Sequence, residues 1–355
     1  MLPSIESLSE TMRGVWLTGH GGFENLKIRD DIPKPQLGPD DVLIQVSAAA
    51  VNNTDINTRT GWYSKQEEAS EDASWGGTPI QFPLIQGADV CGHIVAVGEK
   101  VGTERIGERI LVEPCLWEVN GKKLEQPWYF GSECDGGFAE YTAIASRHAH
   151  KIDSQYSDID LASFPCSYST AENLLTRASV GQGDCILVTG ASGGVGSAVV
   201  QLANVRGAEV IALTSASKAQ AILDLGATKT ILRGEGILKK LGKNSVDVVV
   251  DLVAGKQWSE FLEVLRPKGR YAVSGAIGGP LVELDVRTLY LKDLSFFGCT
   301  VLEPEVFPNL IKCIEDESIR PLVDQVFSLE QIVEAQKAFL SKKHIGKIVL
   351  LVSEA

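Results

Sequence analysis

The fold of this chain is decided by residues 188–203, which read Val-Thr-Gly-Ala-Ser-Gly-Gly-Val-Gly-Ser-Ala-Val-Val-Gln-Leu-Ala. They form the end of an apolar strand, a glycine turn and the start of an amphipathic helix. Gly193 and Gly194 let the backbone turn tightly and approach a pyrophosphate, and Gly196 lets the helix pack against the strand. Free N–H groups at the helix N-terminus complete an anion site. Ala191 replaces the first glycine of a strict G-x-G-x-x-G motif, but the strands on either side still predict a dinucleotide site.

Strands and helices alternate around this turn, from about residue 160 to residue 295. Such alternation predicts a parallel, doubly wound sheet with helices on both faces. The expected helices are 161–178, 194–206, 217–225 and 256–265, and the expected strands are 185–189, 209–213, 230–232, 246–250 and 270–273.

The chain on both sides of this region does not show the same alternation of strands and helices. The first 145 residues read as short strands, expected at 12–17, 41–51, 92–97, 109–113 and 137–143, with a polar, acidic loop at 64–78. That loop is either a solvated connection or a flap beside a cleft. Helices are expected at 305–316 and 329–340 and a final strand at 347–351. We therefore expect a cofactor domain inserted into a β-rich domain, with the three segments at 1–148, 149–297 and 298–355.

Composition limits the class of protein. The 355 residues are 44% hydrophobic and 22% charged, which is typical of a globular protein with two domains. A net charge of −13 argues against a surface for nucleic acid or anionic membrane. Residues 1–11 do not read as a signal peptide, and no segment reads as membrane-spanning. Seven scattered cysteines without a C-x-x-C pair indicate reduced thiols and a cytoplasmic location.

Several ordered segments resemble the medium-chain dehydrogenase/reductase superfamily. They include Val51–Asp55, Pro83–Gly92, Gly136–Tyr141, the glycine turn and His344–Val349, so the resemblance covers essentially the whole chain. It implies an α/β protein in which a GroES-like β-rich catalytic domain carries an inserted Rossmann-type domain.

The resemblance also indicates whether the chain binds a catalytic zinc ion. Zinc-dependent members hold the catalytic ion through a Cys in a C-x-x-D segment, a His-Glu pair and a later Cys or Asp. In this chain Asn52 stands at the first position, Ala88-Asp89 at the second and Cys166 near the third. One thiolate and one carboxylate do not supply three protein ligands and an open position. We therefore expect no zinc and no metal-binding residues, and Cys166 is interpreted as a small residue lining a cleft.

The zinc-free branch that the chain resembles contains quinone oxidoreductases and enoyl reductases. Its members carry N-x-x-D followed by G-x-Y, matched here by Asn52–Asp55 and by Gly61-Trp62-Tyr63. The resemblance makes Tyr63 a candidate catalytic proton donor or oxyanion-stabilising hydroxyl. It makes Asn52 a candidate for orienting the substrate carbonyl or the nicotinamide ribose. A packing role for Tyr63 and a turn role for Asn52 remain alternatives, and Asp55 is interpreted as a helix cap.

The second strand of the dinucleotide fold predicts which nicotinamide is used. NAD-specific sites place an acidic residue at its end. Here that position holds Thr214 or Ser215 with no Asp or Glu nearby, and Lys218 and Arg233 supply cations for a 2′-phosphate. This pattern predicts NADP(H), although Lys218 as a solvated helix residue is an alternative.

Two further positions are assigned to the cofactor by resemblance. Ser274-Gly275 ends another strand at the crevice, and Lys347 either reaches the cofactor or begins an edge strand. The complete predicted cofactor set is Ala191, Ser192, Gly193, Gly194, Val195, Gly196, Thr214, Ser215, Lys218, Arg233, Ser274, Gly275 and Lys347.

Together these features predict a zinc-independent, NADPH-dependent oxidoreductase that transfers hydride to a quinone or an α,β-unsaturated carbonyl. The alternatives are a zinc-type alcohol dehydrogenase acting on secondary alcohols or ketones, and a non-catalytic NADPH-binding protein. The expected partner is a small-molecule substrate, and a homodimer through the edge of the cofactor sheet is common in the family.

Overall fold

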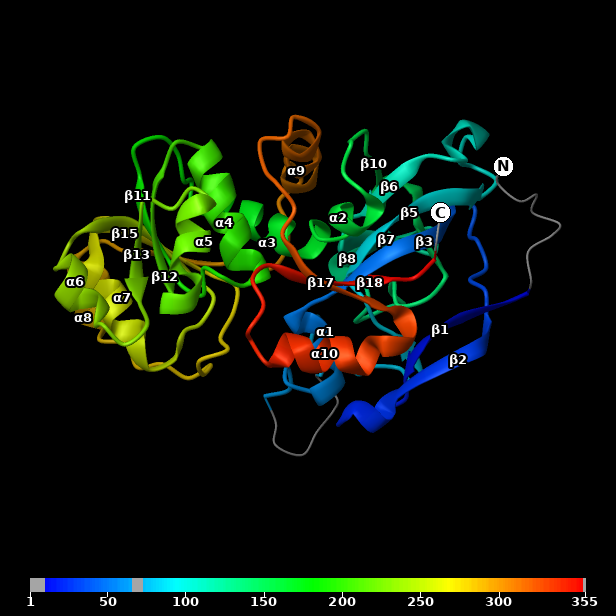
Figure 1. Ribbon diagram of the computed structural model, residues 1–355, viewed down its shortest axis with the longest axis horizontal. Helices are drawn as coiled ribbons and strands as arrows, with labels where there is room; N and C mark the ends of the chain where they lie inside the picture. Colours follow the sequence, from blue (N-terminus) through cyan, green and yellow to red (C-terminus); the bar gives the residue numbers. More distant parts are fainter. Residues whose placement is uncertain (1–9, 66–72, 354–355) are drawn as a thin grey trace. The chain divides into compact units, whose positions relative to one another are not determined.

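The computed structural model describes residues 10–65 and 73–353 (Figure 1). The chain divides into two compact units. Unit 1 contains residues 1–166 and 321–355, and unit 2 contains residues 167–320. Residues 66–72 of the acidic loop predicted at 64–78 lie outside the described residues, so the role of this loop stays a prediction.

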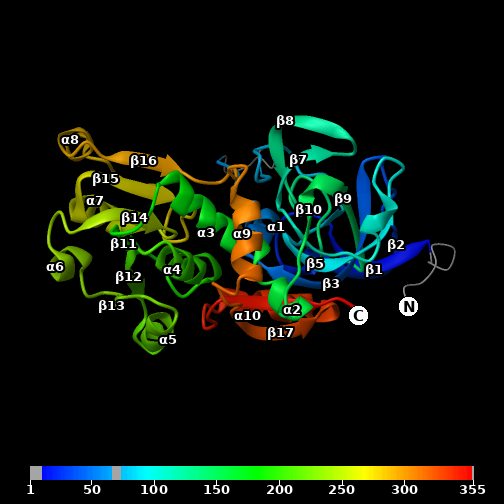
Figure 2. The same ribbon diagram turned by 90° about the horizontal axis from the view of Figure 1, so that it is seen from above.

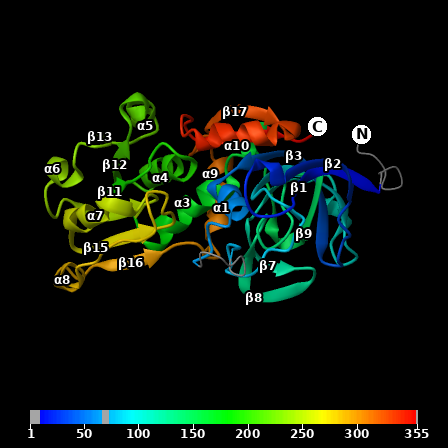
Figure 3. The ribbon, with the colours of Figure 1, turned by 90° about the horizontal axis from the view of Figure 1, so that it is seen from below.

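Unit 1 is built around the long strand β3 (Asp41–Val51), whose side chains are almost all buried. β3 pairs antiparallel with β5 (Asp89–Val97), with β9 (Tyr141–Ala145) and with β18 (Lys347–Leu351). The pairing Ile348↔Val51 joins the N-terminal and the C-terminal segments of unit 1 in one sheet. This sheet runs in the order β10-β6-β5-β3-β18-β17, and a separate sheet has the order β2-β1-β4. Helix α10 packs on β17 and β18 (Figure 3).

The remaining elements of unit 1 are short. They are β1 (Thr11–Leu17), β2 (Leu26–Pro33), α1 (Asn53–Thr60), β4 (Leu84–Ile85), β6 (Arg109–Val112), β7 (Cys115–Val119), β8 (Lys122–Tyr129), β10 (Ala149–Lys151), α2 (Asp158–Leu161), β17 (Val323–Ser328) and α10 (Ile332–Leu340).

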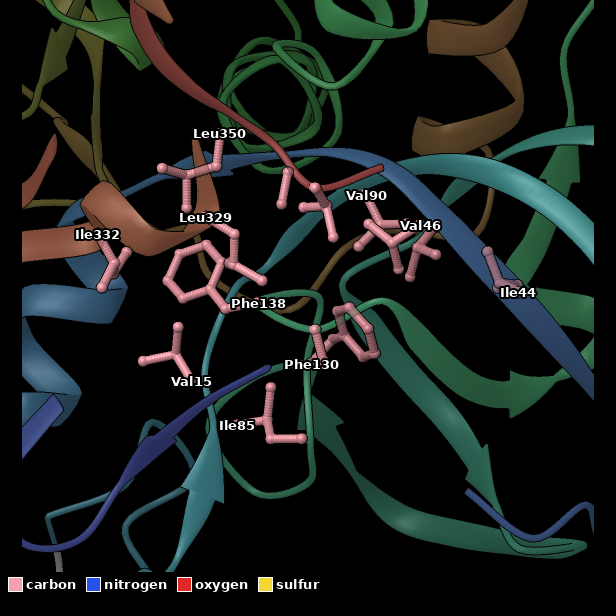
Figure 4. Close-up of a cluster of buried hydrophobic side chains, with 14 of the residues drawn as sticks. Val15, Ile44, Val46, Ile85, Val90, Phe130, Phe138, Leu329, Ile332 and Leu350 are labelled. Atoms are coloured by element: carbon pink, nitrogen blue, oxygen red, sulfur yellow. The ribbon is translucent and has the colours of Figure 1, made fainter. Parts of the chain in front are cut away.

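A buried apolar cluster joins these strands. Figure 4 shows its side chains pointing toward one another from several parts of the sequence: Val15, Ile44, Val46, Ile85, Val90, Phe130, Phe138, Leu329, Ile332 and Leu350. Each fully buried Val, Leu, Ile or Phe side chain contributes about 1.5–3 kcal/mol relative to exposure. The C-terminal segment therefore belongs to the core of unit 1.

Unit 2 is a parallel sheet in the order β13-β12-β11-β14-β15-β16, which Figure 2 shows from one edge to the other. The order reverses at β11, so right-handed crossovers place α4 and α5 on one face and α7 on the other. The elements are α3 (Pro165–Arg177), β11 (Cys185–Val188), α4 (Gly194–Val205), β12 (Glu209–Thr214), α5 (Ala219–Asp224), β13 (Lys229–Leu232), α6 (Ile237–Leu241), β14 (Val246–Asp251), α7 (Trp258–Val264), β15 (Leu265–Val273), α8 (Val286–Leu291), β16 (Ser295–Gly298) and α9 (Val306–Glu315).

The predicted α/β class, a β-rich domain interrupted by a doubly wound parallel sheet, is confirmed. The helix expected at 161–178 begins only at Pro165, as α3, and Leu161 is instead the last residue of the separate short helix α2. Pro165 explains the break, because proline starts a helix well but disfavours helical backbone at the preceding residue. Among the described residues, no helix is long and apolar enough to cross a membrane.

The compact units change at residues 166/167 and 320/321, whereas the sequence placed boundaries after 148 and 297. Helix α2 contacts β3 and β5 and therefore extends unit 1. The segment before α9 is bonded to α3 in unit 2, because Asn173 donates to the carbonyl of Val301 and Arg177 to that of Gly298.

Candidate active site

In unit 1, the candidate site begins at the N-terminus of α1. The backbone N–H of Asn52 donates to Oδ2 of Asp55 at 2.7 Å, and the N–H of Gly87 donates to Oδ1 at 3.2 Å. Asp55 thus serves as a cap of α1, the role that the sequence favoured. Asp55 is 1% exposed, and burial raises its pKa to about 7.

Lys347 enters the same site from β18. Its Nζ donates to Oδ1 of Asn52 at 2.5 Å and to Oδ2 of Asp89 at 2.7 Å. The lysine side chain is 1% exposed and that of Asp89 is 0% exposed. The sequence assigned Lys347 to the cofactor or to an edge strand. The structure places it on β18, which is an internal strand, with its ammonium bound inside unit 1.

Asp89 accepts hydrogen bonds from three residues. Besides Lys347, Nδ2 of Asn52 donates to Oδ2 at 2.8 Å, and the backbone N–H of Cys166 donates to Oδ1 at 2.5 Å. Nδ2 of Asn52 also donates to the carbonyl oxygen of Ala50, at an N···O distance of 3.2 Å. Asn52 is therefore held by its neighbours in unit 1 and is the N-cap of α1, while its role toward the substrate or the nicotinamide ribose stays a prediction.

Two tyrosine hydroxyls lie close to the network. Tyr63 is half-buried and donates from Oη to Oγ1 of Thr54 at 3.2 Å, while Oη of Tyr129 lies 3.1 Å from Sγ of Cys166. Burial raises the pKa of Tyr63 and raises that of Tyr129 well above its usual value. Burial likewise raises the pKa of the Cys166 thiol to about 12. All three groups thus stay protonated at neutral pH and can donate a proton or hydrogen bond.

The residues at the zinc-ligand positions do not fit a zinc ion. Asn52 uses its oxygen for Lys347, Ala88 is a buried residue without a donor atom, and both carboxylate oxygens of Asp89 already accept hydrogen bonds. A catalytic zinc needs three protein ligands. Within residues 10–65 and 73–353, no group of three His, Cys, Asp or Glu side chains could hold a metal ion.

In unit 2, the glycine turn between β11 and α4 has the shape that a pyrophosphate requires. Gly190 has φ +59°, and Gly193 is the N-cap of α4. A Cβ at Gly193 would approach only the carbonyl oxygen of Gly190, at 3.6 Å, so the backbone there is open. The N–H groups of Gly194, Val195 and Gly196 have no intrahelical acceptor and are available to an anion.

The two residues that precede the glycine pair form the base of this turn. Ala191 is fully buried, and its N–H is bonded to the carbonyl of Leu213, so it supports the turn from below. Ser192 is 6% exposed.

The end of β12 brings together most of the predicted 2′-phosphate residues. Thr214 is buried, and within the described part of the chain its Oγ1 has no hydrogen-bond partner. The N–H of Arg233 donates to the carbonyl of Thr214, and the N–H of Lys218 to that of Ser215. The guanidinium of Arg233 is exposed and Lys218 is half-buried. The predicted residues therefore lie together at the end of β12, and their role toward a 2′-phosphate stays a prediction.

Ser274 and Gly275 follow β15 at the same edge of the sheet, because parallel strands all end there. The N–H of Ser274 bonds to the carbonyl of Asp251, at the end of β14. A Cβ at Gly275 would lie 2.8 Å from the carbonyl oxygen of Leu252, so only glycine fits. The residues present therefore fit a dinucleotide along this edge.

Comparison with known proteins agrees with this geometry. Residues 38–154 match the family model "Alcohol dehydrogenase GroES-like domain", and residues 194–316 match "Zinc-binding dehydrogenase". A Sinorhizobium meliloti crystal structure, provisionally named an alcohol dehydrogenase, is 42% identical with a TM-score of 0.89, covering 98% of both chains. The chain belongs to the medium-chain dehydrogenase/reductase superfamily.

Other members of the superfamily are more distant. Acryloyl-coenzyme A reductase of Metallosphaera sedula is 28% identical, covering 96% of this chain and 99% of the relative. Human quinone oxidoreductase is also 28% identical, covering 96% of this chain and 98% of the relative. By their names, both curated relatives are oxidoreductases that act on small molecules.

Sequence reasoning about this medium-chain dehydrogenase/reductase missed the partners of Lys347 and the Tyr129–Cys166 contact. Lys347 and Asn52 are 295 residues apart, and no local pattern links them. The antiparallel pairing of β18 with β3 was the missing information.

Proposed function

We propose that this superfamily member is an NADPH-dependent, zinc-independent reductase of quinones or α,β-unsaturated carbonyls. The observation that carries the proposal is the replacement of a metal-ligand set by a lysine, an amide and a carboxylate, beside two protonated tyrosine hydroxyls. Curated quinone and acryloyl-coenzyme A reductases among the relatives support the same reaction class.

Such substrates do not require a metal. When bound, NADPH supplies the hydride, which adds to the electron-poor carbon of a conjugated system. The displaced electron pair moves to the carbonyl oxygen and forms an enolate or hydroquinone anion. A hydrogen-bond donor then stabilises that oxygen. We assign Tyr63 as the donor, since its raised pKa keeps the proton on Oη until an oxyanion takes it. Tyr129 is the second hydroxyl in this part of unit 1.

The preference for NADPH over NADH rests on the end of β12. Thr214 and Ser215 carry no charge that would repel a 2′-phosphate, and Lys218 and Arg233 contribute positive charge. Charge-assisted hydrogen bonds to phosphate are about twice as strong as neutral ones.

The test is to follow nicotinamide absorbance with NADPH or NADH against quinones, enones and simple ketones, with and without a chelator. Chelator-insensitive oxidation of NADPH by quinones or enones is expected. Activity confined to ketones or alcohols and abolished by the chelator would favour the zinc-type alcohol dehydrogenase. Tight NADPH binding without turnover of any electrophile would favour a non-catalytic role.

We further propose a homodimer formed through the edge strand β16. The chain around it exposes large apolar side chains, including Leu281 at 92%, Leu291 at 70% and Tyr290 at 60%. An edge strand also presents unpaired backbone groups that pair readily with a second copy. Light scattering should give twice the chain mass, and Phe296→Asp, on β16, should give a monomer. A monomeric wild type would refute this assembly. A cytoplasmic location stays a prediction from the reduced cysteines.

A further inference from the structure

The charge balance of the candidate site rests on one buried ion pair. Asp89 and Lys347 are both excluded from water, and Nζ lies 2.7 Å from Oδ2. A buried carboxylate is costly unless an opposite charge lies beside it. Among the described residues, Lys347 is the one Lys or Arg that pairs with Asp89. The other two donors to Asp89, the Asn52 amide and the Cys166 N–H, carry no formal charge.

A second carboxylate makes this cation more important. Asp55 lies in the same network, where the charge of Lys347 lowers its pKa and that of Asp89 raises it. Removing the ammonium would leave the Asp89 carboxylate with only neutral hydrogen-bond donors around it, on the other side of Asn52 from the buried carboxyl group of Asp55.

The backbone before Lys347 is adapted to bring the lysine to this place. Gly346 has φ +77°, and a Cβ there would lie 2.3 Å from the carbonyl oxygen of Leu322. That carbonyl accepts the N–H of Lys347 at 2.8 Å. Only glycine permits this close approach of β18 to the segment before β17. Gly346 therefore allows the backbone position from which the Lys347 ammonium reaches its buried partners.

We infer that the Lys347 ammonium is the resident cation of this site, placed among the residues that align with zinc-ligand positions and making a metal ion unnecessary there. Asn52 supplies an oxygen to this cation, Asp89 supplies the neutralising charge, and the buried Ala88 offers no ligand atom. Lys347 is a positioning residue that fixes Asn52. The inference concerns charge and geometry within unit 1, and it does not depend on which substrate is reduced.

The test compares wild type with Lys347→Met and with the charge-matched double variant Lys347→Met/Asp89→Asn. Methionine keeps most of the volume of lysine and removes the charge. Thermal unfolding of the full chain should show Lys347→Met losing about 10 °C, because it leaves a buried carboxylate without a counter-ion. The double variant should regain at least half of that loss, because no buried charge is left at this pair. Zinc content of the wild type is measured in parallel.

Two results would overturn the inference. The first is a double variant no more stable than Lys347→Met, because Lys347 would then act through packing alone. The second is a stoichiometric zinc ion in the wild-type chain. If Lys347→Met yields no folded protein, recovery of a folded double variant supports the inference, and failure of both variants contradicts it. Turnover is not measured, so these results are separable from those that test the reductase.

Discussion

Gly193 and Gly196 lie three residues apart in one turn and have different surroundings. Gly193 faces mostly open space, whereas Gly196 packs closely against the backbone of the turn. Gly193 has φ −80° and ψ 173°, a backbone conformation open to any residue. An added Cβ at Gly193 meets only the carbonyl oxygen of Gly190, at 3.6 Å. At Gly196, a Cβ would lie 2.2 Å from that oxygen and 2.7 Å from Cα of Ala191. Gly193→Ala should therefore disturb the bound cofactor, and Gly196→Ala should disturb the protein itself.

The size of each effect follows from this geometry. A methyl group at Gly193 occupies the space in which a pyrophosphate would approach the N-terminus of α4. Displacing the anion by about 1 Å loses one or two charge-assisted hydrogen bonds of about 1.5–3 kcal/mol each. The Kd for NADPH should then rise about 10- to 100-fold if one such hydrogen bond is lost, and more if two are lost. Gly196→Ala should instead cost about 1–3 kcal/mol of stability, as overpacking generally does.

Both variants are to be measured by calorimetric titration with NADPH and by urea unfolding. We expect Gly193→Ala to unfold within about 0.5 kcal/mol of wild type while binding weakly. We expect Gly196→Ala to be clearly destabilised. A Gly193→Ala protein that binds NADPH as tightly as wild type would refute the placement of the pyrophosphate at this turn.

Three further outcomes are expected. Tyr63→Phe should lower kcat for enone reduction about 100-fold or more with little change in the Kd of NADPH, and an unchanged kcat would exclude Tyr63 as the acid. Replacing Lys218 and Arg233 with Ala should raise KM for NADPH about tenfold while leaving KM for NADH unchanged, whereas equal effects on both would contradict the 2′-phosphate site. Asp55 has a folded pKa of about 7 against an ordinary value of 3.8, so its contribution to stability is complete below pH 3.8 and is lost as pH rises through 7. Relative to Asp55→Asn, wild type should lose about 2 kcal/mol between about pH 5 and 7.5 in urea unfolding, and parallel pH profiles would show that Asp55 is ionised throughout.

Local patterns predicted the parallel sheet of unit 2 well. β11, α4 and β12 begin and end within one or two residues of their expected positions, because each strand is a short apolar run and the glycine turn lies between them. The β-rich unit was less readable. β2 and β8 were not expected, since most of their residues are exposed and leave little apolar periodicity.

The candidate site divides in the same way. The residues of the nucleotide turn are contiguous, so their shared role is visible in the sequence. The Lys347 network joins the start of α1, the start of β5 and the start of β18, which meet only because β3 pairs with both other strands. A single sequence carries no signal for that pairing. For the same reason the sequence predicted for Lys347 either a cofactor contact or a place in an edge strand. Neither interpretation included its hydrogen bonds to Asn52 and Asp89.

The discontinuity of unit 1 has a consequence for biosynthesis. Asn52 and Lys347 are 295 residues apart, so a ribosome adding roughly 5–20 residues per second takes about 15 to 60 seconds to supply the second after the first. During that interval β3 lacks its β18 neighbour, and Asp89 lacks its counter-ion. Unit 2 is contiguous from residue 167 to 320 and can fold on the nascent chain. The first 166 residues cannot complete unit 1 until residues 321–355 have been synthesised. A chain that terminates just before Lys347 would therefore leave the ribosome with a complete unit 2 and an incomplete unit 1.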